Sequence, residues 1–272
     1  MPSSGEPSQS LPNELQACLP LNYAAAGMIL KIKSPVLEDI IEKQLIWEFF
    51  GRKREGFFIE VGANDPHSGS QTWLLEQNGW RGILVEPQSA LCEKLRPARK
   101  NAQVFQVACS APGKEGEATL HIGTQDGLST LEKQIDSHDV QFARTERVKI
   151  TTLDKVLDEA RVDAIDFLSI DVEGHEIEVM RGLNFEKYRP SLILIEDGVR
   201  NLDKHRFLKQ RGYRLVKRTT LNNWYIPGEQ PFRMTFWLER LELFRKIYLG
   251  LPFRKINLIL RRAKHRDASK GQ

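Results

Sequence analysis

Residues 57–66 read FFIEVGANDP, and this stretch decides the fold class of the chain. Its first five positions are mostly apolar, which predicts a buried strand at 57–61, and Gly62 begins a tight loop after the strand. A pyrophosphate site would carry G-x-G-x-x-G here, because glycines let the backbone approach the phosphates. This loop has one glycine and two acids, Glu60 and Asp65. It therefore favours a cationic ligand over a phosphate-bearing one.

Short apolar runs alternate with helix-like segments along most of the chain. Six further strands are predicted, at 83–86, 104–108, 165–170, 191–195, 213–217 and 223–226. Helices are predicted at about 70–78, 88–98, 152–160, 174–183 and 203–211. Strands that are apolar throughout belong in a parallel sheet covered by helices on both faces. The alternation therefore predicts a doubly wound α/β fold.

The last two predicted strands break the parallel pattern. Residues 218–222 join them, and this connection is too short for a crossover helix, so the two strands must pair antiparallel. A mostly parallel seven-stranded sheet that ends in an antiparallel hairpin, with helices on both faces, is the architecture of Rossmann-like class I methyltransferases. Residues 111–150 do not fit the alternation and predict a small hairpin or a lid.

The chain divides into four predicted parts. Residues 1–33 form a leader that is expected to be mobile, and residues 34–52 form a helix with Ser34 as its N-cap. The α/β domain spans 53–228. Residues 229–272 form a basic amphipathic helical extension, because apolar residues recur there every three or four positions.

Composition places the chain among ordinary globular proteins. With 40% apolar and 28% charged residues, it is neither collagen-like, nor a coiled coil, nor wholly disordered. Its three cysteines, Cys18, Cys92 and Cys109, form no C-x-x-C pair, which argues against a disulfide framework and a zinc cluster. No Lys or Arg precedes Lys31 to open a secretory signal, and the uncharged run 15–30 is too short to span a bilayer. We therefore expect a cytoplasmic protein.

The charge of the chain is unevenly placed. Ten Lys or Arg against two acids give residues 240–272 a charge of +8, which leaves −4 for the rest of a chain whose total is +4. The mildly acidic body has no basic footprint, so no nucleic-acid partner is expected. The basic segment has two interpretations. It makes peripheral contact with the anionic inner face of a membrane, or its apolar stripe packs on the body while the charges stay in solvent.

The second predicted strand ends in Glu86, 26 residues after Glu60. In dinucleotide folds, an acid about 20 residues along accepts hydrogen bonds from a ribose diol. S-adenosylmethionine carries a ribose, a sulfonium and an ammonium but no phosphate, so Glu60 and Gly62 suit its cationic end and Glu86 suits its ribose. The alternative for both acids is ordinary helix capping.

Four motifs within residues 55–218 resemble the FkbM methyltransferases. They are FIEVGANDP at 58–66, GILVEP at 82–87, TLD at 152–154 and FLSIDVEGHE at 167–176. The resemblance implies an S-adenosylmethionine-dependent O-methyltransferase acting on a hydroxyl of a sugar, a glycan or a related natural product. The residues expected at the cofactor are Glu60, Gly62, Asn64, Asp65, Glu86, Pro87, Ala108 and Cys109.

The reacting centre is expected where the fourth and fifth strands end. An alcohol is protonated at neutral pH, so its oxygen needs a base or a metal as it attacks the methyl group. Asp171 and His175 are the candidate catalytic residues, and either can serve as the base, although His175 is equally suited to a structural role. Alternatively, Asp171, Glu196 and Asp197 converge as oxygen ligands for Mg²⁺.

Two other functions fit part of the pattern. A nicotinamide-dependent sugar oxidoreductase would share the architecture, but the missing glycines count against it. A non-catalytic, membrane-associated binding protein would use the basic C-terminal segment and would transfer no methyl group.

Overall fold

The structure is a computed structural model that describes residues 34–123, 129–130, 142–197, 202–219, 221–235 and 237–250. The predicted leader at 1–33 and the last part of the predicted extension, 251–272, lie outside the described residues. Among the residues that are described, no helix is long and apolar enough to cross a membrane.

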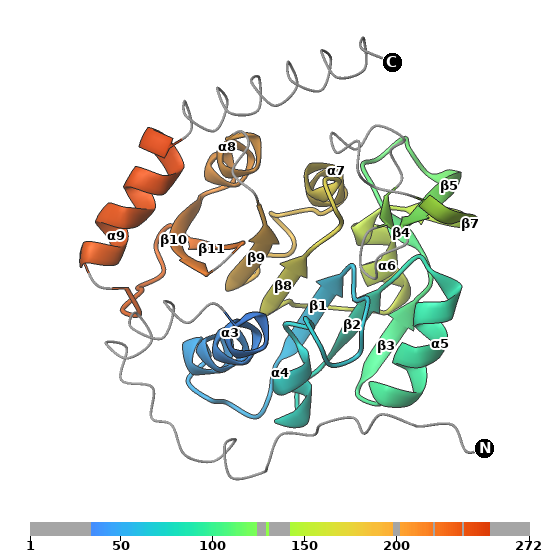
Figure 1. Ribbon diagram of the computed structural model, residues 1–272, viewed down its shortest axis with the longest axis horizontal. Coiled ribbons are helices and arrows are strands. Elements are labelled where there is room, and N and C mark those ends of the chain that lie inside the picture. The colour runs from blue at the N-terminus through green and yellow to red at the C-terminus, as the bar shows by residue number, and fades with distance from the viewer. Residues whose placement is uncertain are drawn as a thin grey trace, which may run out of the picture.

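A seven-stranded sheet forms the centre of the molecule (Figure 1). Its strand order is β10-β11-β9-β8-β1-β2-β3. The strands are β1 (Phe57–Val61), β2 (Arg81–Val85), β3 (Ala102–Phe105), β8 (Phe167–Ile170), β9 (Leu192–Glu196), β10 (Tyr213–Thr219) and β11 (Asn222–Pro227). Five of them run parallel, and β11 pairs antiparallel with both β9 and β10. The predicted Rossmann-like methyltransferase architecture is confirmed.

Helices cover both faces of the sheet. One apolar cluster is built with α6 (Leu153–Glu159), α7 (Glu176–Arg181) and α8 (Asp203–Gln210). The other is built with α3 (Pro35–Phe49), α4 (Trp73–Gln77) and α5 (Ser89–Ala98). Figure 1 shows α7 and α8 on one side of the strands and α3 and α4 on the other. Because both faces are covered, the parallel strands are apolar on both sides, as the sequence predicted.

Helix α3 begins at Pro35, and Ser34 is its N-cap residue, as predicted. The Ser34 side chain makes no capping hydrogen bond. The helix attaches to the C-terminal hairpin through one buried acid, Glu42. Its carboxylate accepts hydrogen bonds from the hydroxyl of Thr219, from Asn222 Nδ2 at 2.7 Å and from Trp224 Nε1 at 3.3 Å. Burial raises the pKa of Glu42 from 4.5 to about 7, because these donors are neutral and no cation offsets the lost hydration.

A second, four-stranded sheet replaces part of the predicted third strand. It holds β4 (Ala108–Cys109), β5 (Gly116–Gly123), β6 (Ser129–Thr130) and β7 (Phe142–Thr151) in the order β4-β7-β5-β6. The strand predicted at 104–108 is therefore split, since β3 ends at Phe105 in the main sheet and β4 pairs with β7. β5 and β7 pair antiparallel, which is the small hairpin expected within 111–150.

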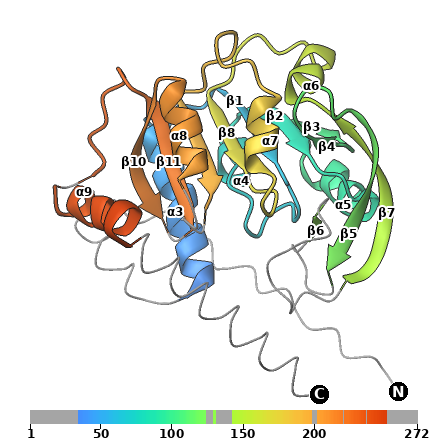
Figure 2. The same ribbon diagram turned by 90° about the horizontal axis from the view of Figure 1, so that it is seen from above.

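The described chain ends in α9 (Trp237–Phe244) and the π-helical turn η1 (Arg245–Leu249). Figures 1 and 2 both place α9 beside β10, at the opposite end of the molecule from β5 and β7. Ile247 is buried, and Lys217 of β10 lies 3.5 Å from Glu239 of α9, so one side of this helical segment packs on the sheet.

Candidate active site

The loop after β1 makes a turn that only glycine fits. Gly62 has a φ of +86°, and a Cβ at this position would lie 1.7 Å from the carbonyl oxygen of Asp171. The Gly62 N–H donates to the carbonyl of Val85 at 2.9 Å, which ties the loop to the end of β2. Glycine is therefore required here because the backbone that follows β8 packs directly against this turn.

Glu86 follows β2 and holds two loops together. Its Oε2 accepts the backbone N–H of Asn64 at 3.0 Å, and its Oε1 accepts the backbone N–H of Gln88 at 2.9 Å. Each carboxylate oxygen keeps a lone pair for a further donor. Burial raises the pKa of Glu86 to about 7. The Glu86 side chain is thus fixed at the edge of the cavity described next, in a place suited to accept from a diol.

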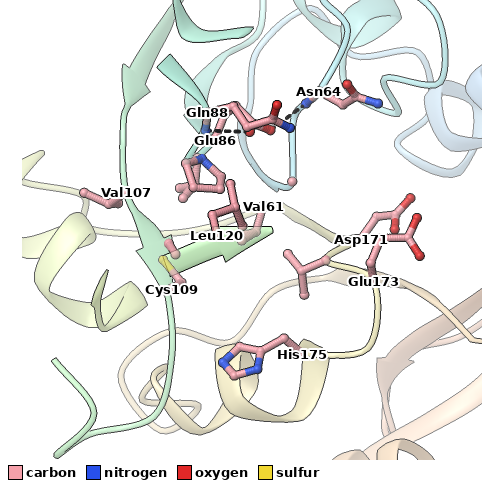
Figure 3. Close-up of a pocket in the computed structure, with 15 residues that line it drawn as sticks. Val61, Asn64, Glu86, Gln88, Val107, Cys109, Leu120, Asp171, Glu173 and His175 are labelled. Carbon is pink, nitrogen blue, oxygen red and sulfur yellow. Dashed lines mark hydrogen bonds between the residues drawn. The ribbon is translucent and has the colours of Figure 1, made fainter. Parts of the chain in front are cut away.

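A cavity of about 620 Å³, partly open to solvent, lies above the ends of β1, β2 and β8. Figure 3 shows Glu86 and His175 at opposite ends, with Val107, Cys109 and Leu120 along one side and Asp171 and Glu173 along the other. The cavity therefore has an apolar wall for a flat ring, while the carboxylates of Asp171 and Glu173 at its other side point away from that wall and are exposed (Figure 3).

Most of the residues predicted to bind a cofactor line this cavity. They are Gly62, Asn64, Glu86, Pro87, Ala108 and Cys109. The thiol of Cys109 is a wall residue and not a nucleophile, because complete burial raises its pKa to about 12.

Glu60, which was predicted to contact the ligand, is not among the residues that line the cavity. Its carboxylate accepts hydrogen bonds from Ser70 Oγ, the backbone N–H of Gln71 and Thr72 Oγ1, and lies 3.8 Å from the guanidinium of Arg99. Successive side chains of a strand point to opposite faces, so Glu60 faces away when its neighbour Val61 lines the cavity. The role that this geometry gives Glu60 is to hold the 62–72 loop in place.

Asp65 is also outside the cavity lining, against the prediction. Its Oδ1 accepts the backbone N–H groups of His67 and Ser68, both at 2.8 Å. This is the local turn that an aspartate commonly makes with its own backbone. Asp65 therefore shapes the loop.

Three carboxylates gather where β8 and β9 end, but they are not the three that the sequence suggested. Oxygens of Asp171, Glu173 and Glu196 lie within 4.8 Å of one another. Asp197 is directed elsewhere, since it accepts from Asn223 Nδ2 at 3.2 Å and lies 3.8 Å from Lys204 Nζ. Glu173 replaces it, because its backbone turns into the left-handed region at a φ of +51°. The predicted Mg²⁺ set of Asp171, Glu196 and Asp197 is corrected accordingly.

Comparison with known families decides what this site belongs to. A sequence profile described as the methyltransferase FkbM domain matches residues 60–215, more than half of the chain. The chain belongs to the FkbM methyltransferase family. It is therefore an S-adenosylmethionine-dependent methyltransferase.

Solved structures of low sequence identity also resemble the chain. No curated protein matches this FkbM methyltransferase. It is similar to the METTL16 methyltransferase domain (12% identity, TM-score 0.41). The match covers 69% of this chain and 66% of that one, which is just under two thirds. It is also similar to a Methanococcus jannaschii fibrillarin pre-rRNA processing protein (11% identity, TM-score 0.37, 65% of this chain and 69% of that one). A third is the precorrin-6y C5,15-methyltransferase of Geobacter metallireducens (13% identity, TM-score 0.35, 68% and 85%). The strand order, and not these likenesses, carries the fold assignment.

The cavity of the FkbM methyltransferase fits the cofactor that the family implies. Gly62 presents only backbone to the cavity, and Glu86 offers carboxylate oxygens to a ribose diol. The apolar wall of Val107, Cys109 and Leu120 suits an adenine ring. When bound, S-adenosylmethionine supplies a methyl group on a positively charged sulfur.

Asp171 has the electrostatics of a proton acceptor. Asp171 is exposed to solvent as a whole residue, but crowding of its carboxylate by protein atoms, the negative charge of Glu196 and a hydrogen bond with Glu196 raise its pKa above the usual range. The charges of Glu173 and Glu176 act in the same direction. Groups with raised pKa values are concentrated at functional sites, where a base must bind a proton readily.

His175 also lines the cavity, at the start of α7. Its Nε2 lies 3.0 Å from the hydroxyl of Ser110, a buried residue just after β4. Sequence reasoning did not find Ser110, because its partner is 65 residues away along the chain. The contact fixes the orientation of the imidazole ring, whether His175 serves as the base or as support for the cavity floor.

Proposed function

We propose that this protein methylates a hydroxyl group of a sugar, a glycan or a related natural product. The observation that carries the proposal is the cluster of carboxylates of Asp171, Glu173 and Glu196, of which Asp171 and Glu173 line the cofactor cavity. Carboxylate oxygens accept hydrogen bonds from hydroxyls, and a sugar presents several of these. The same cluster repels a phosphate or another anion.

Asp171 is the proposed base. A hydroxyl that donates to the ionised form of Asp171 loses its proton to the carboxylate as its oxygen attacks the methyl group. The raised pKa makes this carboxylate a stronger base and reduces its ionised fraction at neutral pH, so activity should increase with pH. The rest of the rate enhancement comes from holding donor and acceptor in line. His175, held by Ser110, is the alternative base.

A divalent cation is the second candidate for activating the hydroxyl. Oxygen ligands suit Mg²⁺, and Asp171, Glu173 and Glu196 each offer one oxygen within the 4.8 Å cluster. A cation there would lower the pKa of a bound hydroxyl in place of the base. If exhaustive chelation leaves activity unchanged, the hydroxyl is activated by a base without metal.

Two alternative functions lose support. Membership of a methyltransferase family leaves no basis for a nicotinamide-dependent oxidoreductase or for a non-catalytic binding protein.

The cytoplasm is the proposed compartment, supported by Cys92 and Cys109, which are both free thiols in the structure.

The experiment is a methyl-transfer assay on unselected acceptors. The purified full chain is incubated with S-adenosylmethionine and with glycan and small-molecule extracts, and mass spectrometry searches for products heavier by one methylene group. We expect a hydroxyl-methylated carbohydrate or related product with the wild-type protein and at least a hundredfold less with Asp171→Asn. Methylation of only nitrogen, carbon or sulfur acceptors would contradict the proposal.

A further inference from the structure

Large apolar side chains are left exposed at the C-terminal end of the described chain. Leu241, Phe244, Tyr248 and Leu249 are 60%, 53%, 42% and 57% exposed. Single exposed apolar residues are ordinary, but a contiguous set marks an interaction site. We call these four residues, together with Arg240 and Arg245, the C-terminal face.

The C-terminal face is the solvent-exposed side of the helical segment. Arg240, Phe244 and Tyr248 border the groove between this segment and β10, and the Tyr248 hydroxyl lies 3.0 Å from His205 Nε2. Ile247 is 2% exposed and Glu239 lies 3.5 Å from Lys217, so the opposite side of α9 and η1 already packs on the body. Both sequence-based interpretations of this segment thus apply to different sides of it. Packing accounts for the buried side and leaves the exposed apolar residues unexplained.

Positive charge borders the exposed apolar residues. Arg240 is exposed, and Arg245 is 68% exposed beside Glu242 at 4.0 Å. A groove of about 700 Å³ adjoins this face, lined by apolar side chains such as Phe232 and by the basic residues His205, Arg214 and Arg240. The face therefore combines apolar contact with cationic groups.

The sequence that follows adds further positive charge. Residues 251–272 contain seven Lys or Arg against one Asp, a net +6, while the rest of the +4 chain sums to −2. These 22 residues leave the described structure directly after Leu249 and Gly250, next to the C-terminal face. The most basic stretch of the chain is thus attached to its most exposed apolar surface.

We propose that the C-terminal face docks the enzyme on an anionic lipid bilayer. An apolar patch bordered by Lys and Arg is the pattern that binds at the interface of anionic membranes, where the apolar side chains insert and the cations meet the headgroups. A second copy of this chain is a poorer occupant, because it would bring two segments of net +6 together. The proposal goes beyond the methylation reaction and does not depend on its acceptor.

Vesicle flotation with the full chain tests the proposal. The probes are vesicles of phosphatidylcholine alone and of phosphatidylcholine and phosphatidylserine in equal parts. Each basic residue near an anionic surface strengthens partitioning by about fivefold, so we expect binding to the anionic vesicles at least tenfold above that to the neutral ones. High salt should weaken this binding, because it screens the headgroup charge.

Two matched variants assign the binding to the C-terminal face. Leu241→Glu with Phe244→Glu should reduce binding to anionic vesicles at least tenfold, because both apolar contacts are replaced by charges that the headgroups repel. Val36→Glu with Leu221→Glu changes two large apolar residues exposed elsewhere, at 64% and 48%, and should leave binding unchanged. Unchanged circular dichroism and S-adenosylhomocysteine binding show that the variants are folded.

Three outcomes would overturn the proposal. The first is no binding of folded wild-type protein to anionic vesicles, and the second is equal binding by both double variants. The third is self-association of the wild-type chain in sedimentation equilibrium without lipid, if Leu241→Glu with Phe244→Glu abolishes it. A second copy of the chain would then cover the C-terminal face. None of these outcomes bears on methyl transfer, which is assayed separately.

Discussion

Two groups of acids in this enzyme lie close to the same cavity but have opposite surroundings. Beneath the loop after β1, Glu60 and Glu76 surround the fully buried guanidinium of Arg99, which also donates to Ser70 and Thr72. At the ends of β8 and β9, desolvation raises the pKa of Asp171 most, and the charged groups that raise it further are all carboxylates. Acids that neutralise a buried cation are structural, whereas an acid among acids holds its proton more readily and is available for chemistry.

The largest expected effect comes from the second group. Asp171→Asn keeps the size of the side chain but removes the proposed base, so kcat should fall by about 10²- to 10⁴-fold. S-adenosylhomocysteine affinity should change little. Stability should not decrease, because the substitution relieves repulsion from Glu196 and Glu173. Steady-state methyl transfer and urea denaturation measure the two expectations.

The control for Asp171→Asn is Glu178→Gln. Glu178 lies on α7, forms ion pairs with Lys114 and Arg181, and is not among the residues that line the cavity. The Glu178→Gln variant should therefore keep full activity. An Asp171→Asn enzyme as active as Glu178→Gln would contradict the assignment of Asp171 as a base or metal ligand.

The second expected effect is on folding. Arg99→Met fills similar space but leaves Glu60 and Glu76 buried without their cation, which should lower the free energy of unfolding by about 3–5 kcal/mol. Urea denaturation provides the measurement. The control is Arg96→Met, at an exposed position of α5, the helix that ends just before Arg99. It should change the free energy of unfolding by less than about 0.5 kcal/mol. Equal stability of the two variants would show that the Arg99 network is dispensable.

The contrast between the two groups also marks the limit of sequence reasoning. The strands of the main sheet follow from runs of apolar residues and the final hairpin from a connection too short for a helix, and both are local signals. The partners of Glu60 are not local in this sense, because Arg99 lies 39 positions along the chain. The two-residue period of a strand does predict that Glu60 and Val61 face opposite ways, and this signal was present in the sequence.

The choice between Glu173 and Asp197 had no local signal. Both are acids just after a strand, and the structure separates them through the left-handed turn at Glu173 and the long-range contacts of Asp197 with Asn223 and Lys204. The split between β3 and β4 is similar, because one apolar run serves two sheets. Ser110 beside His175 likewise emerges only from the folded chain.

Glu42 gives a third, smaller effect, as a buried acid held by neutral donors. Its pKa is raised from 4.5 to about 7. Between these two pH values, Glu42 keeps its proton in the folded protein and loses it in the unfolded chain. Its contribution to stability is therefore fully present below about pH 4.5 and is lost as the pH rises through about 7, by about 1–3 kcal/mol.

Glu42→Gln sharpens this expectation, because glutamine is neutral throughout. The variant should gain stability relative to wild type as the pH rises from about 5 to about 8, measured by urea denaturation at each pH. Glu55→Gln, at an exposed loop position, should leave the pH dependence unchanged. Parallel stability curves for wild type and Glu42→Gln would rule out a raised pKa at Glu42.

The central claim is that the cavity bounded by Gly62, Glu86 and Asp171 binds S-adenosylmethionine, with the Glu86 carboxylate accepting from the ribose. Calorimetric titration with S-adenosylhomocysteine tests it most directly, comparing wild type, Glu86→Gln and the surface control Glu117→Gln. Burial sets the pKa of Glu86 at about 7, so wild-type affinity should increase as the pH rises through that value and the carboxylate loses its proton.

Above that pH, we predict one bound ligand per chain for wild type and Glu117→Gln, and an affinity at least about tenfold lower for Glu86→Gln, because a charged hydrogen-bond acceptor is lost. A folded wild-type protein that binds no S-adenosylhomocysteine, or a Glu86→Gln variant that binds it as tightly as wild type, would contradict the account.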